Sequence, residues 1–361
     1  MAKVPMPNCP NDWTFFGPSP RRRKFALCPC RPLPYPGVVS VLLLGFLGGV
    51  LATNEPPVPS NVVAGTAALS IPVIDTNDPV ENEYYKVMVD DDAAEKEVLG
   101  WMDNADAFAK AGGGSSTLTL NLKIQQRLDG VKREYEDFVE RHPRHVNIRL
   151  AFGSFLNDSR DDEGAFRQWE AARQLAPTNP AAWNNLGKYY LEHDQVTNAF
   201  AYYGKAIELN PSQPVYYHNL AAAVYLFRDP AREFYDLNDA QVFDKAQALY
   251  RQAIKLDPDN FVLFTDYAQS FYGTNPPRWK DGLAAWAEAL KLARDDVERE
   301  GVYLQMAHIH LELGEYEQAR SNLDVVTNTD YAKLKEPLTR DLNQALAKFK
   351  TNAPAPGTPG K

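Results

Sequence analysis

The chain has 361 residues, enough for one elongated or two compact domains, and a formal net charge of −9. Residues 1–52 hold six basic side chains and one acidic one, which makes them +5 and the remainder −14. A folded part with this much negative charge repels phosphate backbones, which excludes nucleic acid as the expected partner of residues 53–361.

The first predicted element is a leader over residues 1–52. A basic run at 21–24 precedes sixteen uncharged, mostly apolar residues, 37–52, which end in a small-residue cleavage pattern at Ala52. As a helix this run reaches about 24 Å, short of the roughly 30 Å hydrocarbon core. The pattern predicts a signal peptide, or a signal anchor if it is retained, and leaves cleavage open. Either way the body is exported, periplasmic or inner-membrane anchored, because positive charge stays in the cytoplasm.

The leader also contains all three cysteines, Cys9, Cys28 and Cys30. Their spacing matches neither a zinc site nor a redox motif, so we interpret them as incidental thiols. Residues 53–79 include five prolines and predict an extended spacer.

Residues 80–145 predict a helical N-terminal region. One helix places Val98, Leu99, Met102 and Phe108 on one side, and glycines at 112–114 break it. A second helix follows, with Val131, Tyr135 and Phe138. These residues occupy the second-helix positions of a degenerate half-copy of the helix-pair repeat that the next part of the chain shows in full.

From residue 146 onward, aromatic and small residues recur with a period of about thirty-four. Counted from Pro180, position 4 is Trp183, position 8 is Gly187 and position 24 is Tyr203. One period earlier, counted from Val146, positions 7, 8, 24 and 32 hold Phe152, Gly153, Trp169 and Pro177. One period later, counted from Pro214 and allowing for thirteen extra residues, positions 4, 8, 24 and 32 hold Tyr217, Ala221, Tyr250 and Pro258. This pattern resembles the tetratricopeptide repeat, in a protein of the exported or membrane-anchored bacterial type.

The resemblance implies an all-α fold, a right-handed α-solenoid of about five helix-turn-helix repeats with N-terminal flanking helices. The repeats are expected at 146–179, 180–213, 214–260, 261–296 and 300–333, with thirteen extra residues in the third and two in the fourth. A cap helix at 334–350 and a disordered tail at 351–361 complete the prediction. Gly187 is expected at a helix–helix contact, because only small residues let two helices approach closely.

In the resembled family the first helix of each repeat lines a concave groove. Lys188 is the only basic residue among the corresponding positions, which disfavours a clamp for acidic chaperone tails. Amides, histidines and tyrosines there suit a peptide instead, although they also suit solvation of the inner face or packing against the N-terminal helices. The predicted partner-binding residues of the groove are Asn147, Ser154, Asn184, Lys188, His218, Tyr225, Gln269, Tyr272 and His308.

The insertion at 227–241 is a second candidate binding surface, through Phe227, Phe234 and Tyr235. These rings are alternatively expected to extend the two flanking helices and to pack on each other.

No catalytic residue, metal ligand or cofactor motif is predicted. The acids of DSRDDEG, 158–164, lack calcium-loop spacing, and the glycines at 112–114 lack the lysine of a phosphate loop. The sequence therefore favours a non-catalytic protein-interaction scaffold whose partner it does not identify, with self-association possible through the open ends of the solenoid. The alternative is a protein that binds or processes a small ligand or carbohydrate, in the groove or the N-terminal region.

Overall fold

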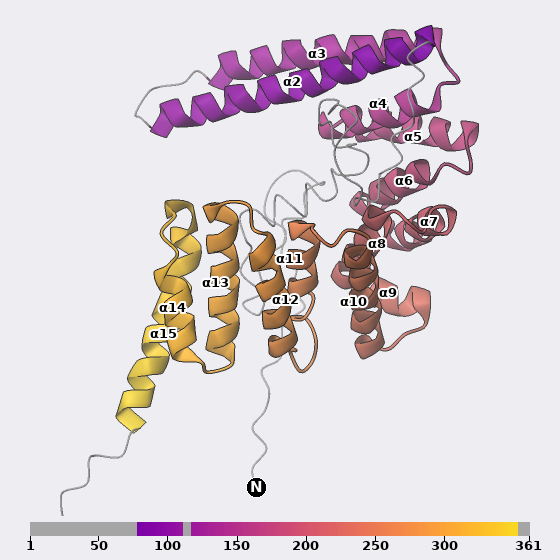
Figure 1. The fold of residues 1–361 in the computed structure, drawn as a ribbon. Helices are drawn as coiled ribbons and strands as arrows, with labels where there is room; N and C mark the ends of the chain where they lie inside the picture. The colour runs from indigo at the N-terminus through magenta and orange to yellow at the C-terminus, as the bar shows by residue number, and fades with distance from the viewer. Residues whose placement is uncertain (1–77, 111–116, 353–361) are drawn as a thin grey trace, which may run out of the picture. The chain divides into compact units, whose positions relative to one another are not determined.

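The computed structural model describes residues 78–110 and 117–352 (Figure 1). Within these ranges every regular element is a helix, which confirms the predicted all-α solenoid class. The leader, residues 53–77 of the spacer, the glycines at 112–114 and residues 353–361 of the tail lie outside the described residues. The helices are α2 (Pro79–Lys110), α3 (Thr117–Arg141), α4 (Val146–Asp158), α5 (Asp162–Leu175), α6 (Pro180–Glu192), α7 (Val196–Leu209), α8 (Pro214–Leu226), α9 (Arg228–Tyr235), α10 (Asp239–Leu256), α11 (Phe261–Gln269), α12 (Trp279–Leu292), α13 (Asp296–Glu312), α14 (Tyr316–Asp324), the 3₁₀ helix η1 (Thr329–Tyr331) and α15 (Ala332–Asn352).

The helices pack as sequential pairs. The partners are α4 with α5, α6 with α7, α8 with α10, α11 with α12, and α13 with α14. Each pair contacts the next, through α5 and α6, α7 and α8, α10 and α11, and α12 and α13. Because one pair cannot bury its apolar surface alone, the hydrophobic core is shared along the stack.

Short polar signals determine where the helices begin. Asn179 caps α6 by accepting a hydrogen bond from the Ala181 amide at 2.9 Å, and Pro180 follows in the first turn, where no intrahelical N–H is needed. Asp161 caps α5 in the same way, accepting from the Gly164 amide at 2.9 Å.

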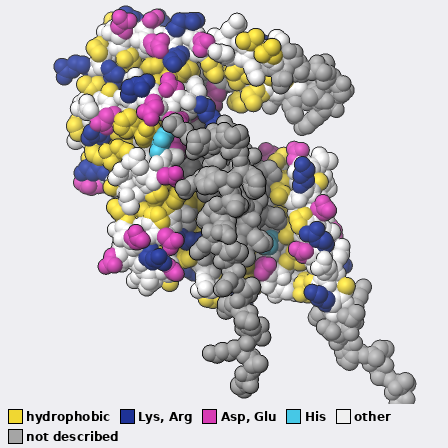
Figure 2. Space-filling model, turned by 180° about the vertical axis from the view of Figure 1, so that it is seen from behind, with side chains coloured by type: hydrophobic (Ala, Val, Ile, Leu, Met, Phe, Trp, Pro, Cys, Tyr) yellow, Lys and Arg dark blue, Asp and Glu magenta, His cyan; other side chains and the backbone are white. Residues whose placement is uncertain are grey.

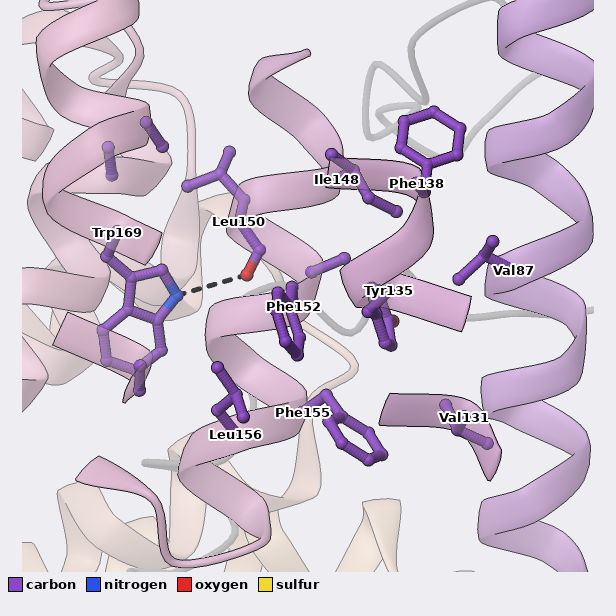
Figure 3. Close-up of a cluster of buried hydrophobic side chains, with 14 of the residues drawn as sticks. Val87, Val131, Tyr135, Phe138, Ile148, Leu150, Phe152, Phe155, Leu156 and Trp169 are labelled. Carbon is purple, nitrogen blue, oxygen red and sulfur yellow. Dashed lines mark hydrogen bonds between the residues drawn. The ribbon is translucent and has the colours of Figure 1, made fainter. Parts of the chain in front are cut away.

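Glycine allows the two helices of a repeat to approach closely. A Cβ atom on Gly187 would lie 2.9 Å from the ring of Tyr203, and one on Gly153 would lie 2.3 Å from Trp169 Nε1. Both rings are fully buried, and the Trp169 indole donates to the Leu150 carbonyl at 3.2 Å (Figure 3). The contact predicted at Gly187 is therefore confirmed.

The N-terminal hairpin, α2 with α3, precedes the repeats and contacts them through α3 and α4. The half-repeat residues Val131, Tyr135 and Phe138 are fully buried in a cluster that also contains Val87 of α2 and Phe152 of α4 (Figure 3).

Part of the expected apolar side of α2 faces outward. Leu99 and Met102 are 53% and 51% exposed, whereas Val98 is half-buried. The side chain of Phe108 lies outside the described residues. The core that α2 shares with α3 is instead built on residues nearer the start of α2, such as Val87.

Candidate functional site

The predicted groove residues lie on the first helices of the repeats, α4, α6, α8, α11 and α13, except Tyr272, which follows α11. Four of them are buried, namely Asn184, Lys188, His218 and Tyr272. The other five are partly exposed, namely Asn147, Ser154, Tyr225, Gln269 and His308.

A column of buried polar residues, which the sequence analysis missed, joins successive repeats. Position 6 of the last four repeats holds Asn185, Asn219, Asp266 and Gln305, which are 1%, 4%, 4% and 2% exposed. The available signal was a polar residue at one position of four successive repeats. That position precedes the two positions, 7 and 8, that carry apolar or small residues.

Three residues of this column bond to the preceding repeat, and their partners are predicted groove residues. Asn219 Nδ2 donates to Asn184 Oδ1 at 2.8 Å, and His218 Nε2 lies 2.7 Å from Asp266 Oδ2. The Tyr272 hydroxyl lies 3.3 Å from Gln305 Oε1. Because a buried polar group without a partner costs free energy, these bonds fix the position of each repeat relative to the preceding one.

The first helices of the repeats, α4, α6, α8, α11 and α13, form what we call the first-helix face. Its part built by α4 and α6 is acidic. Lys188 Nζ lies 4.0 Å from Glu192 Oε1, and Asp158 is also near. Burial raises the pKa of Asp158 and of Glu192 and lowers that of Lys188, and the attraction between opposite charges acts against these shifts.

Asp91 of α2 belongs to the same acidic surroundings. Burial raises its pKa to about 6, and the nearby charges of Glu95 and Asp158 act in the same direction. The Tyr135 hydroxyl donates to Asp91 Oδ2 at 2.5 Å, which opposes the shift.

The α11–α13 part of the face combines aromatic rings with polar atoms. The Trp279 and Tyr272 rings each lie 5.8 Å from the His308 ring, and Trp286 Nε1 donates to the Tyr272 hydroxyl at 2.6 Å. Gln269 Nε2 and His308 Nδ1 are buried and have no hydrogen-bond partner in the part of the chain that the structure describes. Burial lowers the pKa of His308, which keeps the ring neutral at pH 7.

The insertion forms α9 and the start of α10. Phe200 of α7 lies 5.5 Å from the Phe234 ring and 5.6 Å from the Tyr235 ring, and these two rings are 4.8 Å apart. Phe227 is half-buried at the junction of α8 and α9, and Phe234 remains 42% exposed. The rings pack on α7 and on each other, and Phe234 presents the largest free surface of the three.

The described residues contain no cluster of three or more His, Cys, Asp or Glu side chains that could hold a metal ion. Among the described helices, none is both long and apolar enough to span a membrane.

Comparison with known proteins bears on the repeats. Two tetratricopeptide-repeat family models match, one over residues 180–213 and the other over 243–260 and 301–324. The first range coincides with the second predicted repeat.

Similar proteins include two with assembly in their names. The photosystem I assembly protein Ycf3 of Cyanophora paradoxa is 33% identical over 79 residues, which are 22% of this chain and 46% of that protein. The type IV pilus assembly protein PilF of Pseudomonas aeruginosa is 30% identical over 108 residues, 29% of this chain and 43% of that protein. The match thus spans less than half the length of these relatives.

Solved structures of similar fold include PilW, described as a widely conserved type IV pilus biogenesis factor. It is 14% identical with a TM-score of 0.49, and the match covers 62% of this chain and 96% of PilW. The structure of Pseudomonas aeruginosa PilF is 11% identical with a TM-score of 0.46, covering 71% of this chain and 99% of that one.

Proposed function

We propose that this tetratricopeptide-repeat protein is a non-catalytic scaffold that holds a peptide segment of a partner protein along the first helices of its repeats, outside the cytoplasm. The relatives with assembly in their names support the scaffold role. The basic and apolar leader supports export of the repeats.

One observation carries the proposed binding mode. The unpartnered nitrogens of Gln269 and His308 lie on the first-helix face with the Tyr272 and Trp279 rings beside them. An amide N–H₂ donates, and a neutral imidazole nitrogen donates or accepts according to its tautomer. Both nitrogens are buried, so a peptide reaches them only when neighbouring side chains move aside; they then match the C=O and N–H of an extended peptide, and the partly exposed Trp279 ring supplies apolar contact for its side chains.

The buried groove residues have a different proposed role. Asn184 and His218 are engaged with the next repeat and hold the first helices in register. The partly exposed residues, Asn147, Ser154, Tyr225, Gln269 and His308, are the ones proposed to meet the peptide.

Panning a random peptide library on the full-length protein tests this function. We expect enriched peptides to bind the wild type and to lose at least tenfold in affinity to a Gln269→Ala/His308→Asn variant whose melting temperature is unchanged. The matched control is Phe234→Ala, which alters the exposed insertion and should leave binding intact. Loss in the control alone would move the site to α9, and the absence of any enriched peptide would contradict peptide binding.

The proposed location has its own test. We expect the repeats, in the natural host, to be degraded by protease added to cells whose outer barrier has been opened while the cytoplasmic membrane is intact. Protection equal to that of a cytoplasmic marker would contradict export.

A further inference from the structure

The outer face of α2, opposite its contact with α3, carries a regular stripe of exposed residues. Tyr85, Val89 and Leu99 are 44%, 48% and 53% exposed, in a helix whose other side contributes the buried Val87 and Ala94 to the core. Figure 2 shows hydrophobic side chains among charged ones on the surface of the described residues. Exposed large apolar side chains on the same face of one helix make that face a candidate interaction surface, which the order of the charges between them then decides.

The spacing of this stripe is that of a coiled-coil seam. Tyr85, Val89, Asp92, Lys96 and Leu99 are separated alternately by four and three residues, which is the alternation of the inward-facing positions of a heptad. The hairpin presents this seam on the side away from the buried Ala94. Met102, 51% exposed, flanks the same seam.

The sequence of the seam is complementary to itself in one direction only. Positions equidistant from residue 94 face each other when two copies of α2 run antiparallel. Val89 then meets Leu99 of a second copy, and Asp92 meets Lys96. In a parallel pair Asp92 would face Asp92 and Lys96 would face Lys96, which charge repulsion disfavours.

We infer that the outer face of α2 binds a second copy of this chain, forming an antiparallel two-fold dimer centred on Val89, Asp92, Lys96 and Leu99. Within one chain Lys96 Nζ already lies 2.6 Å from Asp92 Oδ2. Two such pairs, brought together about the two-fold axis, form a four-charge network between two apolar contacts. A two-fold interface of this kind uses the same patch on both copies and leaves no open end.

A charge exchange tests the dimer. Asp92→Lys and Lys96→Asp each place like charges across the two-fold axis, so either variant alone should dimerise at least tenfold more weakly than the wild type in analytical ultracentrifugation. Mixed in equal amounts, the two variants should form a heterodimer of near wild-type affinity, because one copy then presents two lysines to two aspartates of the other. All proteins are full-length and keep residues 1–77, so association through those residues would be the same in every sample.

Three results would overturn the inference. They are a wild type that stays monomeric at every concentration, single variants that associate as well as the wild type, and a mixture that fails to associate. The variant Leu99→Glu should separate the copies while the helical circular dichroism is retained, because Leu99 is exposed in the single chain.

Discussion

The repeats and the N-terminal hairpin are held together by different physical means. Within the repeats, a glycine opposite an aromatic ring sets the helix separation, as with Gly153 and Trp169. The hairpin buries larger apolar side chains such as Val131 and adds polar contacts at its margin, where Arg127 Nη2 lies 2.8 Å from Asp90 Oδ1 and His142 Nε2 lies 3.1 Å from Glu83 Oε2. These pairs are partly buried near the surface, contribute about 0–1 kcal/mol each and weaken with added salt, whereas shape complementarity does not.

The largest effect is expected where shape alone decides the packing. Gly153→Leu places side-chain atoms in the space of the Trp169 ring, which is fully buried and bonded to the Leu150 carbonyl. Overpacking typically costs about 1–3 kcal/mol, and the 2.3 Å approach to Trp169 Nε1 places this substitution at the upper end. Urea denaturation should show this loss, and an unchanged midpoint would mean that the helix pair is looser than the structure shows.

The next effect tests the polar column inside the repeats. Asn219→Ala removes the donor to Asn184 Oδ1 and leaves that buried oxygen without its cross-repeat partner. The expected loss in the free energy of unfolding is about 2 kcal/mol. In the double variant Asn184→Ala/Asn219→Ala the two losses should not add, because both remove the same bond. Strict additivity would show that the two asparagines act independently.

The same contrast explains what the sequence could predict. The period, the glycine contact and the rings at position 24 followed from residue size and spacing, because the repeat brings like positions together in every copy. The column at position 6 was missed, since a polar residue in an amphipathic helix is ordinarily assigned to solvent, and only packing showed Asp266 facing His218. The exposure of Leu99 was missed for the opposite reason, since periodicity shows that an apolar side exists without showing what covers it.

The hairpin should respond to pH through Asp91. Its pKa is raised to about 6, above the ordinary value of about 4. The contribution of Asp91 to the free energy of unfolding is therefore complete below pH 4 and is lost as the pH rises through 6. Asp91→Asn keeps an acceptor for the Tyr135 hydroxyl and has no charge to bury. We expect the variant to match the wild type at pH 4 and to exceed its free energy of unfolding by about 2–3 kcal/mol at pH 7.

Urea titrations at several pH values measure this difference, and the exposed Asp129→Asn on α3 is the matched control. A gap between Asp91→Asn and the wild type that stays constant from pH 4 to pH 7 would show that Asp91 does not titrate as the burial of its carboxyl requires.

The smallest expected effect comes from glycine-to-alanine variants, which test whether the N-terminal hairpin and the repeats unfold together. Gly130 of α3 and Gly204 of α7 lie inside helices, and a Cβ atom on either would meet nothing within 4 Å. Alanine at each should therefore stabilise its helix by about 0.5–1 kcal/mol. In a linear stack each unit contacts only its neighbours, so a local gain is felt mainly where it is made. Hydrogen exchange should show slower opening of α2 and α3 alone in Gly130→Ala, and of α6–α8 in Gly204→Ala. If both variants slowed exchange along all the described helices equally, the hairpin and the repeats would form a single cooperative unit, coupled through the buried cluster that α2, α3 and α4 share.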